Sequence, residues 1–503
     1  MLIDTRNRLP GTPRGTPPMQ HDLFSNIPSR REFLRRAGLG CGSLALTALL
    51  HDQGIIAAEP ATAASTNPLA PRPPHYAGKA KAVIWLFQTG SPSQVDTFDY
   101  KPELQKRNGQ KMSGADPKTG FFTTSGKCLK SPFEWNRHGK SGIWVSEIFP
   151  QLSKHVDDMA FIYSCYSRSN NHTPAMLELN SGSIRQGFPS MGSWVTYGLG
   201  SENANLPAFV VMHGVKPRGG DPIWSSGFLP SVYQATALDP RQAKPIDNLD
   251  QPADLRKPQQ RALLDALRAS NARHATGRPF ERDLTARLES FELAFRMQAA
   301  APEAFDVAKE PEHIRESYGL NRKESEAYGR QCLIARRLIE RGVRFVQIFA
   351  SCPSAPGGGV TDVPWDAHSS VSDNHGTVAK TVDQPSAALL ADLKARGLLD
   401  ETLVIWGGEF GRTSDSQGSA GRDHNPNSFT TWMAGGGIKG GSTYGASDDF
   451  GYKAVENRVN SHDLHATVLH LLGLEHTKLT YRFNGRDFRL TDVEGEVIRD
   501  LLA

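Results

Sequence analysis

The sequence predicts an α/β fold, a three-layer sandwich in which helices cover both faces of a largely parallel central sheet. Five short apolar runs are spread along the chain, and such nearly continuous runs are typical of strands that are buried on both faces. Segments with a helical periodicity of apolar residues lie between these runs. The alternation of the two patterns therefore favours a parallel sheet that is covered by helices on both sides.

The expected elements follow one another along the chain. The strands are residues 81–90 (KAVIWLFQTG), 157–165, 206–214, 342–350 and 401–408. The helices are residues 173–183, 190–199, 325–342 and 384–399. Residues from about 250 to 325 differ, because they contain two polar amphipathic helices, 254–275 and 282–305, without an expected strand. We interpret this region as a helical insertion that could serve as a lid.

The N-terminal region has the features of an export signal. The charged segment SRREFLRR (29–36) precedes a short apolar run and then a zone of small residues, the order typical of a cleaved signal. Arg30 and Arg31, with Phe-Leu shortly after them, match the twin-arginine form of bacterial signals. The alternative is a basic helix that packs on a buried apolar helix. The resulting domain assignment is a twin-arginine signal peptide and the start of a linker at 1–64, a Pro/Ala-rich linker at 65–78 and the main domain at 79–503.

The charge of the chain argues against nucleic acid as a partner. The formal net charge is +4, but residues 1–58 hold 7 Arg against 4 acidic residues, which leaves 50 basic and 49 acidic groups for the rest. A nearly neutral body gives no electrostatic reason to expect nucleic acid or an anionic membrane. No stretch after the signal is apolar enough to be a candidate span, so we expect no transmembrane helix in the mature chain.

The cysteines do not identify a metal or redox motif. Cys41 would leave with the signal, and the four that remain are widely separated, without a C-x-x-C pair. An oxidising compartment would permit one or two disulfides, whose connectivity the sequence does not give. The four are Cys128, Cys165, Cys332 and Cys352.

In open α/β sheets ligands bind outside the carboxyl ends of the strands, so the residues that follow each expected strand are the candidates for chemistry. After the first strand, Asp96 offers oxygen ligands for a metal. After the second, Thr173 precedes Pro174, which predicts a helix with Thr173 as its N-cap. A hydroxyl at a helix N-terminus faces free backbone N–H groups that stabilise an oxyanion or a bound phosphate, and His172 stands beside it.

After the fourth expected strand, a Gly-rich loop leads to Asp366 and His368. These two residues are two positions apart, so an extended segment would turn both side chains to one side. His375 follows closely. An Asp-x-His segment with another histidine nearby has the residue types of half a metal site.

After the fifth expected strand, Glu409 and Arg412 emerge, and Asp423 and His424 return after a Gly/Ser-rich loop. The loop would let a second set of ligands return to a site that the strand end begins. Arg412 would pair with a tetrahedral oxyanion or hold a ligating carboxylate. The predicted metal ligands are Asp96, Asp366, His368, Glu409, Asp423 and His424.

Each of these residues also has a purely structural interpretation. Asp96 could cap a turn, any one histidine could be an ordinary loop residue, and Glu409 with Arg412 could form a surface salt bridge. We favour a site because four strand ends offer acidic residues, histidines and a hydroxyl at one edge of the same sheet.

Five motifs make the chain resemble a known family. They are GSPSQVDTFDYKP (90–102), NNHTPAMLELNSGS (170–183), WDAHSS (365–370), GGEFGRT (407–413) and GRDHNP (421–426). With the export signal, they are similar to the secreted bacterial proteins of domain-of-unknown-function family 1501 (DUF1501), from about residue 79 to 502. That family resembles a distant branch of the alkaline phosphatase/sulfatase superfamily. Members of the superfamily have a central mixed sheet, one or two divalent metals and a Ser, Thr or formylglycine nucleophile at a helix N-terminus.

The resemblance implies roles for individual residues. Thr173 lies where the nucleophile would be, Asp366 and His368 match the Asp/His ligand segment, and His424 resembles a later His ligand. Glu409 stands near the point where an Asp-His pair ends a strand in phosphatases.

The sequence also departs from the superfamily pattern. The first strand ends in QTGSPS where phosphatases carry an Asp, and Phe410 takes the place of a His ligand. There is no Cys-x-Pro-x-Arg sequence, so formylglycine sulfatase chemistry is not supported. These departures leave open whether Asp96 substitutes for the missing Asp or whether one metal is absent.

Two hypotheses of function follow. The first is an exported metal-dependent hydrolase of a phosphate or sulfate ester, with Thr173, His172 and Arg412 at the reacting centre and zinc, calcium or manganese as its metal. Its partners would be a small-molecule or polysaccharide ester and the twin-arginine export machinery, and its location would be periplasmic or extracellular. The alternative is a non-catalytic extracytoplasmic binding protein that retains the hydrolase fold. The substrate is not readable from the sequence.

Overall fold

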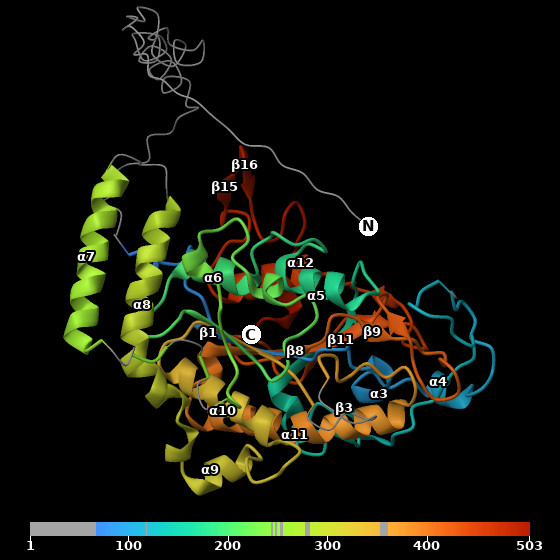
Figure 1. Ribbon diagram of the computed structural model, residues 1–503. Coiled ribbons are helices and arrows are strands. Elements are labelled where there is room, and N and C mark those ends of the chain that lie inside the picture. The colour runs from blue at the N-terminus through green and yellow to red at the C-terminus, as the bar shows by residue number, and fades with distance from the viewer. Residues whose placement is uncertain are drawn as a thin grey trace, which may run out of the picture. The chain divides into compact units, whose positions relative to one another are not determined.

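The centre of the structure is an eight-stranded sheet with the order β12-β4-β11-β8-β1-β7-β5-β6 (Figure 1). The computed structural model describes residues 67–116, 118–242, 245–246, 249–251, 255–276, 282–352 and 361–503. The strands of this sheet are β1 (Ala82–Phe87), β4 (Met159–Cys165), β5 (Phe209–His213), β6 (Thr236–Leu238), β7 (Phe345–Phe349), β8 (Thr402–Gly407), β11 (Phe429–Ala434) and β12 (Ser442–Tyr444).

The predicted α/β class with a largely parallel sheet is confirmed. Strand β1 pairs in parallel with β7 and β8, β5 pairs in parallel with β6 and β7, and β12 pairs in parallel with β4. Among the described strands of this sheet, β11 alone runs antiparallel to its neighbours, β4 and β8. All five expected strands belong to the sheet, and their carboxyl ends therefore lie at one edge.

Three strands of this sheet were not predicted from the sequence. Strands β6 and β12 have three residues each, too few to show a pattern. Strand β11 reads FTTWMA, and its two threonines interrupt the apolar run, although all six of its residues are buried. Its burial depends on the strands on either side, which a local pattern does not reveal.

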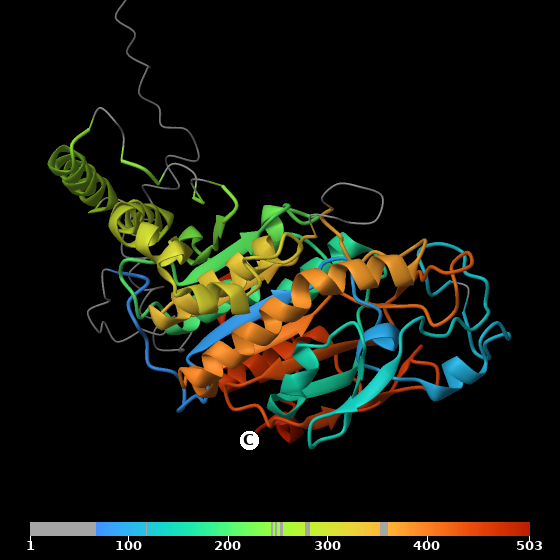
Figure 2. The ribbon, with the colours of Figure 1, turned by 90° about the horizontal axis from the view of Figure 1, so that it is seen from below.

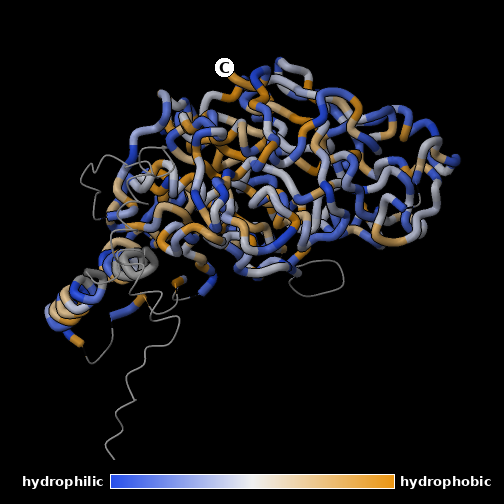
Figure 3. Tube along the Cα trace, turned by 90° about the horizontal axis from the view of Figure 1, so that it is seen from above, coloured by the Kyte–Doolittle hydropathy of each residue, from blue (hydrophilic) through white to orange (hydrophobic). Residues whose placement is uncertain are grey.

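Helices cover both faces of the sheet, in agreement with the three-layer prediction (Figures 1 and 2). Alternate residues of β1 point to opposite faces. Val83 and Trp85 pack in a core with helices α5 (His172–Ser181), α6 (Met191–Leu199) and α12 (Ser461–Leu471). Ile84 and Leu86 pack in the other core with α10 (Glu326–Glu340) and α11 (Val371–Ala395). Figure 3 shows apolar residues gathered inside the body and polar ones along its outer loops.

Helix α11 begins well before the expected start at residue 384. Ser370 caps it by accepting a hydrogen bond from the backbone N–H of Asp373, and the helix continues through Pro385. A proline often marks a helix boundary, but here tertiary packing retains the helix on both sides of Pro385.

The expected helical insertion contains α7 (Lys257–Thr276), α8 (Arg282–Phe305) and α9 (Glu312–Ser317). No strand lies among the described residues from 257 to 317. Arg261 of α7 pairs with Glu292 of α8, and Met297 and Ala301 of α8 join the core beneath α10. The C-terminal part of α8 is therefore part of the main body, and the exact limits of the insertion stay a prediction.

The remaining α-helices and strands are short and lie outside the main sheet. They are α3 (Gln94–Thr97), α4 (Pro102–Lys106), β2 (Trp135–His138), β3 (Ile143–Ser146), β9 (Gly411–Arg412), β10 (His424–Asn425), β13 (Ala446–Ser447), β14 (Ala454–Glu456), β15 (Tyr481–Phe483) and β16 (Arg486–Phe488). None of the helices that the structure describes has the length and apolar character needed to cross a membrane. The predicted export signal, with Arg30 and Arg31, falls outside the described residues.

Candidate metal centre

The site forms where segments that follow four strands meet at the carboxyl edge of the sheet. They follow β1, β4, β7 and β8, whose parallel directions place their ends together. A fifth segment returns because β11 is antiparallel and so begins at this edge. The returning strand β10 pairs with β9, and His424 lies directly opposite Arg412. The Gly/Ser-rich loop between them closes this short ribbon.

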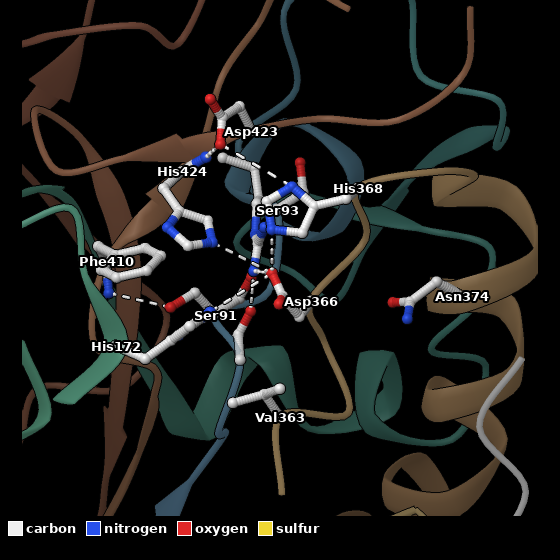
Figure 4. Close-up of polar contacts among 12 residues, drawn as sticks. Ser91, Ser93, His172, Val363, Asp366, His368, Asn374, Phe410, Asp423 and His424 are labelled. Atoms are coloured by element: carbon white, nitrogen blue, oxygen red, sulfur yellow. Dashed lines mark hydrogen bonds and ion pairs between the residues drawn. The ribbon is translucent and has the colours of Figure 1, made fainter. Parts of the chain in front are cut away.

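Three histidines surround a single carboxylate oxygen (Figure 4). The Nε2 atoms of His172, His368 and His424 lie 3.4, 2.9 and 3.2 Å from Oδ1 of Asp366. We call these four residues the ligand cluster. Two of them remain in contact with solvent, because the side chains of Asp366 and His368 are 16% and 23% exposed. Solvent therefore reaches part of the cluster.

The other ring nitrogen of each histidine is held by a hydrogen-bond acceptor. His172 Nδ1 lies 2.6 Å from Oε1 of Glu409, and His424 Nδ1 lies 2.6 Å from the carbonyl oxygen of Asn170. His368 Nδ1 lies 2.6 Å from Oε1 of Gln417. Since these partners accept hydrogen bonds, each Nδ1 carries a proton and donates it. In the neutral ring, each Nε2 then presents a lone pair to Asp366.

Nitrogen lone pairs that face a carboxylate oxygen repel it unless a cation lies among them. The Nε2 atom of His172 is buried and has no hydrogen-bond partner among the described residues. Among the described residues, two groups have ligand atoms that all lie within 4.8 Å of one another. They are His172, Asp366 and His424, and His368, Asp423 and His424. Imidazole nitrogens fixed through Nδ1 and joined by a carboxylate are typical of a transition-metal site, so the residues fit a divalent metal.

The electrostatics of the cluster favour an ionised Asp366 and a neutral His424. Burial would raise the pKa of Asp366, but the charge of Arg412 holds it well below its usual range. Burial, together with the charge of Arg412, lowers the pKa of His424 to about 4. Burial would also lower the pKa of His172, but the neighbouring carboxylates of Asp366 and Glu409 raise it instead.

Glu409 lies beside the cluster and orients one of its histidines. Its Oε1 accepts from the backbone N–H of Gly90 at 3.0 Å as well as from His172. Its Oε2 is buried without a partner among the described residues. Glu409 belongs to neither group of possible ligands, so the structure places it behind His172 rather than among the converging atoms.

Arg412 joins the cluster through a charge contact. Its Nη2 lies 2.7 Å from Oδ1 of Asp366, and its Nε donates to the carbonyl of Ser91 at 3.1 Å. The guanidinium is fully buried, and its Nη1 has no partner within the described part of the chain. Ser91 has a positive φ of 65°, a conformation that non-glycine residues rarely adopt and that often occurs at functional sites.

Asp423 connects the cluster to a neighbouring loop. Its Oδ1 accepts from the backbone N–H of His424 at 2.8 Å and lies 3.8 Å from Nδ1 of His368. Its Oδ2 accepts from the backbone N–H of Phe122 at 2.5 Å. The predicted ligand Asp423 is therefore at the cluster, but both of its oxygens already have backbone partners.

Asp96 lies outside the ligand cluster. It forms an ion pair with Arg422, with distances of 2.6 Å from Nε to Oδ2 and 3.2 Å from Nη2 to Oδ1, and both side chains are fully buried. Ser93 donates to Asp96 through its hydroxyl and to Nε2 of His375 through its backbone N–H. We call Ser93, Asp96, His375 and Arg422 the buried anchor. Neither group of possible ligands in the described chain includes Asp96 or His375.

The polar side-chain atoms of the anchor all have hydrogen-bond partners within the described part of the protein. The Arg422 guanidinium also donates to the backbone carbonyls of Thr413, Ser414 and Leu129. Burial would raise the pKa of Asp96, but Arg422 lowers it, while burial lowers the pKa of His375 to about 3. A neutral His375 accepts one hydrogen bond through Nε2 and donates another through Nδ1 to Asn374.

Helix α5 begins two residues earlier than the predicted N-cap at Thr173 implies. Asn171 is the N-cap and His172 is the first helical residue, so the expected cap at Thr173 is wrong. Pro174 then occupies the third position, where its missing N–H costs nothing because the first N–H groups of a helix have no partner within it. Thr173 is half-buried, and its hydroxyl makes no hydrogen bond among the described residues. Its methyl group packs against the turn at Gly219.

Sequence reasoning missed several residues that position the cluster. Arg422 lies inside a motif that was singled out for Asp423 and His424, and its adjacent charge was the available signal. Gln417 lies in a Gly/Ser-rich loop, where no sequence pattern indicates that it contacts a histidine. The four cysteines that could have formed disulfides are unpaired and buried.

Comparisons with known proteins place the chain in a family. A search of curated proteins gave no significant match. Similar solved structures include the lipoteichoic acid synthase LtaP from Listeria monocytogenes, with 9% identity, a TM-score of 0.36 and coverage of 84% of this chain and 78% of that chain. Alkaline phosphatase from the Antarctic bacterium TAB5 has 10% identity and a TM-score of 0.33, and covers 79% of this chain and 99% of that chain. The phosphonate monoester hydrolase SpPMH from Silicibacter pomeroyi has 13% identity and a TM-score of 0.33, and the match covers 70% of this chain and 71% of that chain.

A family model matches nearly all of the chain that follows the expected linker. The model is described as "Protein of unknown function (DUF1501)", and it matches residues 80–502. This match confirms the resemblance that the five motifs indicated. The chain therefore belongs to the DUF1501 family.

Proposed function

We propose that this protein is an exported metal-dependent hydrolase of phosphate or sulfate esters. One observation carries the proposal: three imidazole Nε2 atoms converge on Oδ1 of Asp366 while their Nδ1 atoms are fixed by acceptors. Structural histidines seldom direct three lone pairs at one carboxylate, whereas metal ligands are oriented in this way. The substrate would be a small-molecule or polysaccharide ester.

The residues divide into those that would hold the metal and those that hold them in place. His172, Asp366, His368 and His424 would bind it, and Glu409, Gln417 and the carbonyl of Asn170 orient the rings. A divalent metal in such a site acts as a Lewis acid and lowers the pKa of a nucleophilic hydroxyl or water. Three nitrogen donors with one carboxylate favour zinc or manganese over calcium, which prefers oxygen ligands.

The position of Arg412 favours a substrate with an anionic group. Its charge is buried beside Asp366, and its Nη1 still has a hydrogen to donate. A guanidinium in a site of low dielectric stabilises the negative charge of a phosphate or sulfate group. Its Nε and Nη2 contacts with the turn after β1 hold it in a fixed orientation.

Thr173 is the proposed nucleophile. It follows the proposed ligand His172 directly, at the N-terminus of α5, where backbone N–H groups point outward without partners in the helix. Thr173 is half-buried and its hydroxyl makes no hydrogen bond to the described residues, so it has no structural task that would compete with attack on an ester.

The test uses the mature protein, its metal content and a panel of aryl phosphate, phosphodiester and sulfate esters with added zinc, manganese or calcium. We expect stoichiometric metal and hydrolysis of at least one ester. Thr173→Ala should abolish turnover while metal content stays normal, whereas Thr173→Ser should keep much of the activity because the hydroxyl remains.

The other outcomes separate the alternatives. Activity that survives in Thr173→Ala would assign the attack to a water molecule. Bound metal without hydrolysis of any ester would favour the alternative, a non-catalytic binding protein. The absence of bound metal when all three ions are supplied would refute the hydrolase proposal.

Export is a separate part of the proposal and rests on the twin-arginine sequence alone. Replacement of Arg30 and Arg31 by lysine should retain the precursor in the cytoplasm, because the export machinery recognises the arginine pair. Fractionation of cells that express the two forms measures this directly. Equal periplasmic yield of both forms would show that the segment is not a twin-arginine signal.

A further inference from the structure

Two adjacent phenylalanines stand at the edge of the ligand cluster with their side chains half exposed. Phe121 and Phe122 are 51% and 50% exposed, although a phenyl ring gains free energy from burial. The ring of Phe121 lies 5.8 Å from that of His424, and the ring of Phe122 lies 5.0 Å from that of His368 in an edge-on arrangement. The two phenyl rings contact each other at 5.1 Å. We call this pair the aromatic rim.

The rim is held by the same residues that position the cluster. Asp423, next to His424, accepts the backbone N–H of Phe122 at 2.5 Å. Asn170, whose carbonyl fixes His424, donates its side-chain amide to the carbonyls of Thr119 and Gly120 at 3.2 and 2.9 Å. The loop is therefore attached at two points to residues of the site.

Gly120 shows how closely the loop approaches the site. A Cβ atom at this position would lie 2.1 Å from Oδ2 of Asp423, so any residue but glycine would push the carboxylate away. The close fit sets the backbone just before Phe121 and Phe122. The exposure of the two rings thus results from a backbone that is fixed by side-chain hydrogen bonds, and the rings are preorganised for contact.

A buried phenylalanine on the cluster gives the contrast. Phe410 is almost fully buried and packs its ring against those of His172 and His424 at 5.0 and 4.7 Å. Its task is packing. Phe121 and Phe122 also contact cluster histidines, but they remain half exposed, and two of the cluster side chains are also partly exposed.

We propose that the aromatic rim binds the alcohol part of the substrate, and that this part is a ring with an apolar face, an aryl group or a sugar. The inference rests on the proposed ester hydrolase function and adds the class of the alcohol. With the anionic group directed to the cluster and Arg412, the ring next to the ester oxygen would lie over Phe121 and Phe122. Aromatic side chains bind the flat apolar faces of such rings through stacking and edge contacts. An ester of a small aliphatic alcohol would lack this contact.

The test compares ring-bearing and ring-free ligands on the metal-loaded protein. Calorimetry measures the binding of phenylphosphonate, glucosyl phosphonate and methylphosphonate, which are not hydrolysed, and kinetics measures kcat/KM for the matching phosphate esters. We expect wild type to prefer at least one ring-bearing ligand over the methyl ligand. Phe121→Ala or Phe122→Ala should reduce that preference by about tenfold, the size of one lost aromatic contact with its buried area.

Two further variants make the result specific. Phe122→Trp retains a flat ring and should keep the preference. Phe291→Ala removes a phenylalanine of similar exposure, 54%, on helix α8, and should leave the preference as in wild type. Thermal unfolding of all variants identifies any that has lost its fold.

The outcomes distinguish the two proposals. A ring preference in binding that falls in Phe121→Ala or Phe122→Ala supports the rim even if no ester is hydrolysed, in which case only the hydrolase function fails. A preference for phenyl but not for glucosyl identifies an aryl ester, and the reverse identifies a sugar ester. If wild type binds methylphosphonate as tightly as both ring-bearing ligands, or binds none of them, the rim proposal is overturned. A preference that is unchanged in both alanine variants overturns it as well.

Discussion

The ligand cluster and the buried anchor contain the same kinds of side chain at the same edge of the sheet, yet their hydrogen bonding is opposite. Each has an aspartate, histidine and a neighbouring arginine. In the anchor, His375 Nε2 accepts a backbone N–H at 2.8 Å and Asp96 has Arg422 and Ser93 as partners. In the cluster, three Nε2 atoms face a carboxylate oxygen that does not donate to them.

This difference indicates how a ligand site is distinguished from a structural network. A network whose donors and acceptors are all matched stabilises the fold and has no atom left for a ligand. A cluster in which acceptors face acceptors has a deficit that a cation removes. The two regions are also coupled, because the backbone N–H of Arg422 donates at 2.9 Å to the carbonyl of Ala367, between the proposed ligands Asp366 and His368.

The largest expected effect is a loss of bound metal when the ligand cluster, but not the buried anchor, is changed. Asp366→Ala and His368→Ala should reduce bound metal from stoichiometric to trace, since each removes a donor from the cluster. The loss of activity should exceed the roughly 10- to 100-fold that removal of an outer partner of a metal ligand costs. Elemental analysis of the purified proteins measures the metal directly.

His375→Gln is the matched control for that experiment. Gln can still accept the N–H of Ser93, and the residue lies in the anchor, so the variant should retain its metal. Loss of metal in His375→Gln with retention in Asp366→Ala would reverse the assignment of the two regions.

The second expected effect is on stability and concerns the anchor. Asp96→Ala leaves the guanidinium of Arg422 buried without its counter-charge, which typically costs about 3–5 kcal/mol of the free energy of unfolding. The double variant Asp96→Leu/Arg422→Met should recover part of this loss, because apolar residues replace both charges. Urea unfolding in the presence of a chelator measures the effect without any contribution from metal. A loss below about 1 kcal/mol in Asp96→Ala would mean that the pair is not buried as described.

The smallest expected effect is a pH dependence of stability that comes from His375. Burial lowers its pKa to about 3, against 6.5 for an unperturbed histidine, and Asp96, Arg412 and Arg422 are the charged groups that act on it. Below pH 6.5 the unfolded chain takes up a proton that the folded protein does not, so this stability is present above pH 6.5 and is lost as the pH falls. At pH 5 the loss amounts to about 2 kcal/mol.

His375→Gln should remove this part of the pH dependence. Its unfolding free energy should change less than that of wild type between pH 7 and pH 5, when both are measured by urea unfolding with a chelator. Parallel pH profiles would show that His375 is protonated to the same extent in the folded and unfolded states.

The sequence by itself determined the class of fold and the edge at which the candidate site lies. Apolar runs such as residues 401–408 and amphipathic helices are local patterns, because burial on two faces or on one face is repeated within a few residues. The rule that ligands gather at the carboxyl ends of parallel strands then pointed to Asp366, His368, Glu409 and His424, which the structure brings together. Strand β11 was not predicted, because its burial comes from its neighbours in the sheet.

Only the tertiary structure decided which of these groups already had partners. From the sequence alone, Asp96 and Asp366 are equally good candidates for a metal ligand. In the structure, Asp96 pairs with Arg422, which is 326 positions away, whereas Asp366 lies against three imidazole nitrogens. The protonated nitrogen of each ring likewise depends on acceptors contributed by distant segments, such as the carbonyl of Asn170 for His424. Hydrogen bonds form between atoms a few ångströms apart in space, whatever their separation along the chain. A local pattern therefore predicts which residues reach the edge of the sheet, and the contacts across that edge determine which of them remain available to bind a ligand.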